Sequence, residues 1–110
     1  MKYYSLRRDN GRDIAFNGEF ICYVDSRDYG HRDHSRGKTA RRWTEMALYR
    51  TEGGSLVVTI SGRSDMPGEV DRVKAHVFDN KEDMFDGIGF SYLAKAMYDD
   101  AGIASEELIK

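Results

Sequence analysis

The sequence predicts an α+β fold in which an antiparallel β-sheet of about five strands, joined as a meander, packs against C-terminal helices. Up to residue 78, short apolar-polar alternations are separated by turn signals such as Asn10-Gly11 and Gly53-Gly54, which is typical of β-hairpins. From Asn80 onward the apolar residues recur every three or four positions, which is typical of amphipathic helices. With 110 residues and no linker or repeat, we expect a single domain over 1–110.

The expected strands cover residues 2–6, 13–25, 41–50, 55–61 and 70–78. Because Asn17-Gly18 interrupts the second of these, residues 13–25 form either a tight hairpin or one long bulged strand. The strand at 55–61 is the most apolar, and it is expected to turn Leu56, Val58 and Ile60 toward the core. In the last strand, alternation places Val73, Ala75 and Val77 inward.

The C-terminal part is expected to form two helices. Asn80 can cap a short helix, because its side chain can accept a hydrogen bond from the first turn. Gly87 and Gly89 then break the helical pattern, and a second helix is expected from Phe90 to Asp100. Its apolar stripe consists of Phe90, Leu93, Ala94 and Met97. These helices would cover one sheet face and leave the other face open.

Composition excludes several classes of protein. The single cysteine, Cys22, excludes an internal disulfide framework and is expected to be an inert buried thiol. No apolar run reaches about 18 residues, so we expect no membrane span. The polar start is unlike a signal peptide, so the expected location is the cytoplasm.

Charge divides the chain into a basic and an acidic half, although the net charge is only −2. Residues 1–50 hold 11 Lys and Arg against 7 Asp and Glu, and residues 51–110 hold 6 against 12. This asymmetry is typical of two oppositely charged contact surfaces, or of two solvated faces of one small domain.

Three sets of side chains are candidate binding residues. The first is a basic loop over residues 27–42, which could bind phosphates or protein carboxylates: Arg27, Arg32, Arg36, Lys38, Arg41 and Arg42. The second is an aromatic group on the open sheet face: Tyr23, Trp43 and Tyr49. The third is an acidic group on the helices: Glu82, Asp83, Asp86, Asp99 and Asp100.

Enzymatic chemistry has little support in the sequence. His31 and His34, with Asp28 and Asp33 nearby, could bind a divalent metal, which keeps a small metal-dependent enzyme as one alternative. However, their spacing does not suit a helix-borne ligand pair. No motif of a nucleophilic or metal hydrolase occurs, so we expect neither catalysis, a bound metal nor a cofactor.

Two stretches resemble a group of known proteins. Phe16-Asn17-Gly18-Glu19-Phe20 and Arg42-Trp43-Thr44-Glu45-Met46-Ala47-Leu48-Tyr49-Arg50-Thr51-Glu52-Gly53-Gly54 are similar in order and spacing to small single-domain β-meander proteins of bacterial plasmids, integrative elements and phages. The resemblance covers about half of the chain. In style these proteins resemble anti-CRISPR and other anti-defence inhibitors, which implies steric or charge-mimicking contact rather than catalysis.

Together these observations favour a non-enzymatic protein-binding module, an inhibitor that occupies a surface or a nucleic-acid channel of a host defence complex. The expected partner is a protein such as a host nuclease or surveillance complex, and a homodimer is compatible with the pattern. The first alternative is a nucleic-acid-binding accessory protein that uses the basic loop 27–42. The second is the small metal-dependent enzyme centred on His31 and His34.

Overall fold

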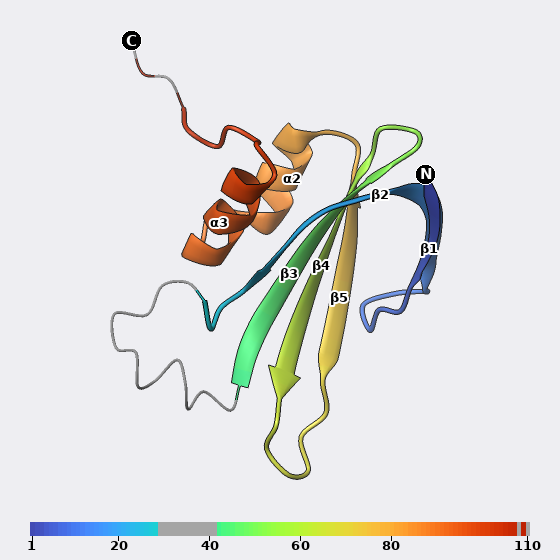
Figure 1. The fold of residues 1–110 in the computed structure, drawn as a ribbon, viewed down its shortest axis with the longest axis vertical. Helices are drawn as coiled ribbons and strands as arrows, with labels where there is room; N and C mark the ends of the chain where they lie inside the picture. The colour runs from blue at the N-terminus through green and yellow to red at the C-terminus, as the bar shows by residue number, and fades with distance from the viewer. Residues whose placement is uncertain (29–41, 108, 110) are drawn as a thin grey trace.

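Five strands lie side by side in the order of the sequence, so the sheet is the antiparallel meander that the sequence predicts (Figure 1). The computed structural model describes residues 1–28, 42–107 and 109. The strands are β1 (Lys2–Leu6), β2 (Ile14–Asp25), β3 (Arg42–Thr51), β4 (Leu56–Ser64) and β5 (Arg72–Phe78). The sheet curls into a half-barrel, and the helices α2 (Lys81–Ile88) and α3 (Tyr92–Asp100) pack on one of its faces.

β2 is one long bulged strand, which decides between the two alternatives for residues 13–25. Its pairing register with β3 shifts between Phe20 and Cys22. β1 pairs only with the first half of β2, from Leu6 opposite Ile14 to Lys2 opposite Gly18. A Cβ atom on Gly18 would collide with the backbone of Arg50 on β3, so only glycine permits this close approach.

Both helices begin at side-chain caps. Asn80 accepts a hydrogen bond from the backbone N–H of Asp83, and Ser91 accepts one from the N–H of Ala94. α2 ends at Gly89, whose φ of 84° is in the region that favours glycine. The second helix therefore begins two residues later than predicted, and Phe90 lies in the connection between the two helices.

The main core lies between the helices and the sheet face that they cover, which we call the helix face. From the sheet it contains Leu48 and Val58, and from the helices Met84, Met97 and Tyr98, all with an exposed fraction of zero. The Tyr98 hydroxyl donates a hydrogen bond of 2.8 Å to the carbonyl of Gly89, so its polar atom is satisfied inside the core. The thiol of Cys22 lies against the carbonyl of Met97 at 3.4 Å, and burial, with a smaller contribution from the charge of Asp100, raises its pKa to about 11.

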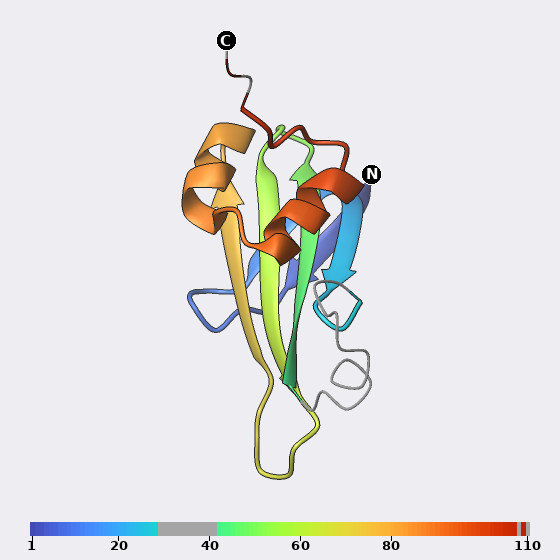
Figure 2. The same cartoon turned by 90° about the vertical axis from the view of Figure 1, so that its left-hand side faces the viewer.

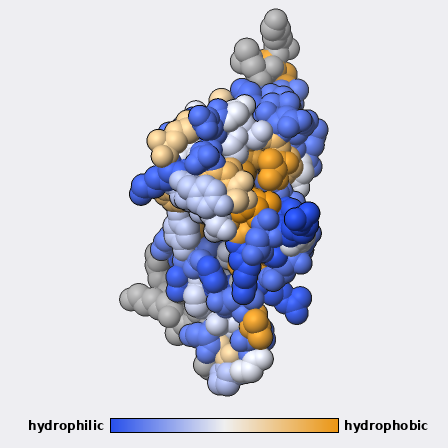
Figure 3. All heavy atoms as spheres, turned by 90° about the vertical axis from the view of Figure 1, so that its right-hand side faces the viewer, coloured by the Kyte–Doolittle hydropathy of each residue, from blue (hydrophilic) through white to orange (hydrophobic). Residues whose placement is uncertain are grey.

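The other sheet face, which we call the opposite face, is not fully open. Tyr4, Phe16, Phe20 and Tyr49 form an aromatic cluster there, with ring centroids 5.1–5.7 Å apart. Tyr49 is half-buried in this cluster because the curl of the sheet brings β1 toward β3. Figure 3 shows this side of the molecule, which is mostly hydrophilic around a small hydrophobic cluster.

The turn between β1 and β2 closes the curl. Residues 7–13, which we call the edge turn, reach the free edge of β5. The N–H of Asp9 donates to the carbonyl of Val73 at 2.6 Å, and the N–H of Val73 donates to the Asp9 carboxylate at 2.7 Å. The Asn10 side-chain amide binds both the N–H and the carbonyl of Ala75, each at 3.0 Å. One backbone N–H and the side chains of Arg8, Asp9 and Asn10 thus take the place of a sixth strand along part of this edge.

The structure corrects the prediction for β5. Because Val58 lies opposite His76, and Gly62 opposite Arg72, the charged residues of this strand point to the helix face. Val73, Ala75 and Val77 point to the opposite face, where Ala75 is fully buried and Val77 is half exposed. Simple alternation could not show this, because the curl gives the opposite face a small core of its own.

Candidate functional site

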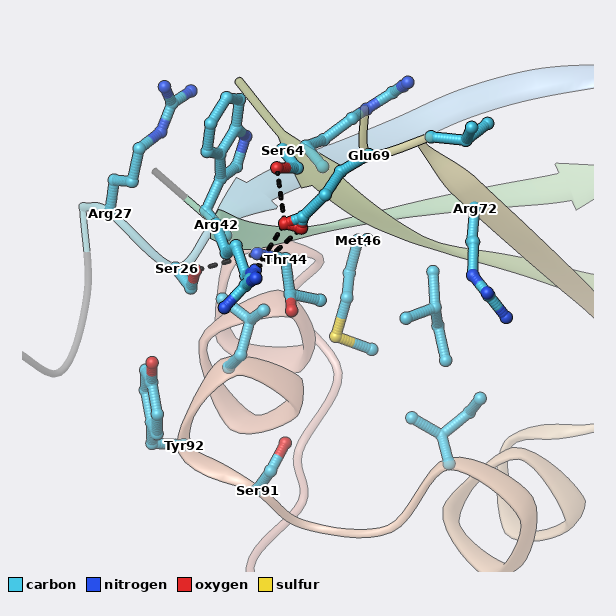
Figure 4. A pocket seen from close by; sticks show the side chains of 17 residues that line it. Ser26, Arg27, Arg42, Thr44, Met46, Ser64, Glu69, Arg72, Ser91 and Tyr92 are labelled. Atoms are coloured by element: carbon cyan, nitrogen blue, oxygen red, sulfur yellow. Dashed lines mark hydrogen bonds and ion pairs between the residues drawn. The ribbon is translucent and has the colours of Figure 1, made fainter. Parts of the chain in front are cut away.

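A groove of about 940 Å³ lies on the helix face, where the helices no longer cover the sheet. Figure 2 shows α2 and α3 over one half of the sheet, while β3, β4 and β5 continue beyond them. The groove is bounded by these strand ends and by the connection between the helices (Figure 4). Its apolar and aromatic lining is Trp43, Met46, Ile60, Val70, Ile88, Tyr92 and Leu93.

Gly62 lies on the central strand of the groove, between Thr44 of β3 and Arg72 of β5. A Cβ atom built on Gly62 would meet no atom of the described residues within 4 Å, and the φ of Gly62 is outside the left-handed region. Neither crowding nor backbone conformation therefore requires glycine here. The missing side chain leaves a hollow between two polar residues, Thr44 and Arg72.

Two arginines stand on either side of this hollow. The Nε of Arg42 donates to both carboxylate oxygens of Glu69, at 2.7 and 2.9 Å. Arg72 extends into the groove from β5, and no carboxylate of the described residues lies within ion-pair distance of it (Figure 4). The groove therefore combines an apolar lining with uncompensated positive charge, which suits an anionic ligand with apolar groups.

On the opposite face, a chain of polar contacts runs along the same end of the sheet. Asp25 is buried and binds Arg27 through several hydrogen bonds, the shortest at 2.6 Å. Those bonds, from the Arg27 side chain first, hold the pKa of Asp25 below its usual value despite burial. The guanidinium of Arg27 also lies 4.0 Å from the centre of the Trp43 ring, as a cation–π contact.

Glu45 continues this chain from β3. Burial opposes its ionisation, but hydrogen bonds from Trp43 and Arg63, both at 2.9 Å, outweigh burial and lower the pKa of Glu45. Arg63 also donates to Asp71 at 3.1 Å. The pKa of Tyr23 rises to about 12, first through burial and then through its neighbour Glu45. Each charge in this chain has a partner, so the chain is suited to holding the strand ends together.

The basic loop is only partly covered by the structure. Arg27 and Arg42 both line the groove, from the two chain segments that flank the loop. The remaining members of the set lie outside the described residues, as do both histidines of the metal hypothesis: Arg32, Arg36, Lys38, Arg41, His31 and His34. Among residues 1–28, 42–107 and 109, no group of three or more metal-ligating side chains lies together.

The aromatic candidates do not form one open surface. Tyr49 belongs to the aromatic cluster, Trp43 lies under Arg27, and Tyr23 is 46% exposed with its hydroxyl 3.3 Å from the Asp25 carboxylate. Only Tyr23 combines exposure with a position on the predicted face. The aromatic set is therefore mainly used within the protein.

The acidic candidates are all exposed on the helices, with Glu82, Asp83 and Asp86 on α2 and Asp99 and Asp100 on α3. Glu82 and Asp83 lie in the first turn of α2, where the helix dipole favours negative charge. Asp99 and Asp100 lie in the last turn of α3, where it does not. Helix stability thus explains the first pair and leaves the second unexplained.

Sequence reasoning missed Gly62, Glu69 and Arg72, which give the groove its character. It ended the fourth strand at Ser61 and assigned residues 62–69 to a loop, whereas β4 continues to Ser64. An isolated glycine within a strand was the available signal, because such a residue indicates a bulge or the close approach of another chain.

Comparison with known proteins gives no further guide to this site. No family model matches the chain, and no curated protein or solved structure matches it. No helix in the described part of the chain is long and apolar enough to cross a membrane. Function is therefore argued from the geometry of the groove.

Proposed function

We propose that this chain is a non-enzymatic binding module that holds an acidic, partly apolar segment of a larger protein in the groove. The observation that carries the proposal is the hollow at Gly62, with the guanidinium of Arg72 beside it, which pairs with no carboxylate in the described part of the chain. A volume of about 940 Å³ is at the upper end of small-molecule sites, and the groove is open along the sheet. Both properties suit a peptide segment better than an enclosed small molecule.

Gly62 supports the presence of a ligand, because a glycine in this strand lowers the stability of the fold and no neighbouring residue in the described part of the chain explains it. Glycine in a strand is less stable than alanine by about 0.5–1 kcal/mol, since it loses more backbone freedom on folding. Nothing near Gly62 excludes a side chain. A ligand that needs the hollow gives the missing reason.

The positive charges of Arg72 and Lys74 on the helix face of β5 have an alternative explanation. Charged residues that point inward on an edge strand can protect the sheet from aggregation. In this protein, however, Asp9 and Asn10 already occupy the edge of β5 at Val73 and Ala75. Arg72 is therefore available for a different task, and its position in the groove favours ligand binding.

The biological setting is the second part of the proposal. The resemblance to proteins of mobile elements and phages suggests an inhibitor that acts in the cytoplasm on a host nuclease or surveillance complex. The module would occupy a surface of that complex through the groove and need no cofactor. The sequence resemblance supports this biological setting, whereas the geometry of the groove supports the binding of an acidic segment.

The test fills the groove without disturbing the fold. Gly62→Leu places a side chain in the hollow, and Gly53→Leu is the matched control in the exposed β3–β4 turn, where a Cβ would meet only the Thr51 hydroxyl at 3.9 Å. Tagged proteins would be used to capture partners from a host lysate, with mass spectrometry of what is retained. We expect the Gly53 variant and the parent to retain the same protein and the Gly62 variant to lose it.

Two results would count against the proposal. Equal capture by both glycine variants would show that the groove is not the contact surface. A mobility shift of DNA or RNA by the parent, lost in Gly62→Leu, would instead favour the nucleic-acid-binding alternative.

A further inference from the structure

The mouth of the groove already holds a carboxylate, that of Glu69 in the connection between β4 and β5. Besides Arg42, its oxygen Oε1 accepts a hydrogen bond from the Ser64 hydroxyl at 3.2 Å. The bond with Arg42 comes first among the causes that lower the pKa of Glu69, and it outweighs partial burial. Glu69 is thus an ionised acid held by two groups at the edge of the groove.

Hydrogen bonds within the β4–β5 connection hold Glu69 at the mouth of the groove. The N–H of Met66 donates to the Ser64 hydroxyl, and the N–H of Glu69 donates to the carbonyl of Met66. Gly68, with a φ of 82°, allows the chain to reverse just before Glu69. Asp71 accepts a hydrogen bond from the N–H of Ser64 at 3.0 Å, which closes the connection at its base.

Arg42 is only partly used by this contact. Glu69 binds its Nε, and neither terminal nitrogen has a partner among the described residues. An arginine binds a carboxylate most strongly as a fork, through two nitrogens. The side chain of Arg42 is 69% exposed, so its present ion pair contributes little and is easily exchanged.

Glu69 and the residue after it together have the chemistry of the ligand that the groove favours. Val70 is 80% exposed and lines the groove. The chain therefore presents at the groove mouth an acid followed by an exposed apolar side chain. This is the same chemistry that the apolar lining and the free Arg72 favour in a partner.

We propose that Glu69 is a built-in competitor for the groove, and that the partner anchors there through an Asp or Glu side chain that displaces Glu69 from Arg42. This inference rests on the proposed function and names the group by which the partner is recognised. The incoming carboxylate takes the side-on fork of Arg42, formed by Nε and one terminal nitrogen, so Glu69 has to leave Nε. A second acidic group of the same segment binds Arg72. Displacement of Glu69 sets the threshold of affinity that a segment must exceed.

The test uses a defined probe, a fluorescein-labelled eight-residue peptide of alternating Glu and Leu. Its affinity is measured by fluorescence anisotropy for the parent, Glu69→Gln, Glu52→Gln and Arg72→Gln. Glu52 is the matched control, since it is an exposed glutamate in the β3–β4 turn and its removal changes the net charge equally. Circular dichroism confirms that each exposed-site variant is folded.

We expect Glu69→Gln to bind the peptide about three- to fivefold more tightly than the parent, which corresponds to losing one exposed ion pair. Glu52→Gln should change the affinity less than twofold, and Arg72→Gln should weaken it. On addition of the peptide, the Nε–H nuclear magnetic resonance signal of Arg42 should move in the parent.

The outcomes separate the two proposals. If the peptide binds the parent but Glu69→Gln gains no more than Glu52→Gln, Glu69 is not a competitor, and the proposed function stands without it. If the parent and Gly62→Leu bind the peptide equally, the groove is not the site, and both proposals are wrong. If a phosphoserine peptide gains more than the glutamate peptide in Glu69→Gln, the anchor is a phosphate, and the assignment of a carboxylate is wrong.

Discussion

Replacing Asn10 by Ala tests whether the edge turn stabilises the sheet from outside. Asn10 is exposed, and exposed positions usually tolerate substitution within about 0.5 kcal/mol. Here, however, its amide makes two hydrogen bonds of 3.0 Å to the backbone of Ala75. The carbonyl of Ala75 keeps a second donor, the guanidinium of Arg8 at 3.0 Å, but the N–H keeps no partner among the described residues.

The expected loss of stability follows from the two hydrogen bonds that the substitution removes. Each hydrogen bond contributes a net of about 0.5–1.5 kcal/mol, and a buried donor without a partner costs about 1–3 kcal/mol. Ala75 has an exposed fraction of zero, so its freed N–H is poorly hydrated. We therefore expect Asn10→Ala to lower the free energy of unfolding by about 2 kcal/mol, with a fall in melting temperature of about 10 °C.

Urea unfolding followed by circular dichroism measures this change, provided that the free energy of unfolding depends on urea concentration with the same slope in both proteins. The matched control is Arg12→Ala. Arg12 is exposed in the same turn, and its contact with a side chain of the described residues is made by its backbone carbonyl, which accepts a hydrogen bond from Arg8 and is kept in the variant. We expect that control to stay within about 0.5 kcal/mol of the parent. Equal midpoints for the two variants would refute the view that side chains seal the edge of β5.

Three further predictions concern the core and the charges. Leu93→Ala should cost about 2–5 kcal/mol in a urea titration, whereas Phe90→Ala, 48% exposed and outside α3, should cost clearly less; the reverse order would contradict the observed start of α3. Below about pH 4 the parent should lose stability more steeply than Asp25→Asn. The folded pKa of the Asp25 carboxyl is lowered, so its ionised form stabilises the protein above the unfolded pKa, and this contribution is lost as the pH falls. Parallel curves of unfolding free energy against pH for the two proteins would show that Arg27 does not stabilise the ionised form. Cys22, with its pKa raised to about 11, should not react with iodoacetamide at pH 8 until the protein is unfolded in urea, and rapid labelling of the native protein would contradict its burial.

Local patterns were sufficient to predict the fold. The turn signals and the change of period at Asn80 predicted the meander and the two helices, and Asn80 does cap α2. They failed at β5, where Arg72 and Val73 exchange the faces that alternation alone assigns. The face of an edge strand depends on how its sheet curls, and this curl comes from contacts such as Asn10 with Ala75, which are 65 residues apart in sequence.

The candidate site was harder to predict than the fold, for a similar reason. The charge of Arg42 predicts a binding residue, and Arg42 does line the groove. The charge of Arg27 and the aromatic ring of Trp43 also predict binding residues, and both line the groove, but the two side chains pack against each other as a cation–π pair. Gly62 and Arg72 become neighbours only through strand pairing, so no local pattern could bring them together.

The contact between the edge turn and β5 also has a consequence for the order in which the protein folds. The edge turn leaves the ribosome before β5, because Val73 and Ala75 follow their partners Asp9 and Asn10 by 64 and 65 residues. At a synthesis rate of about 5–20 residues per second, the turn waits several seconds for its partner. Until then the hairpin of β1 and β2 has no closed sheet to join. The backbone N–H groups of Asp9, Val73 and Ala75 can therefore become protected from hydrogen exchange through this contact only after β5 has been made.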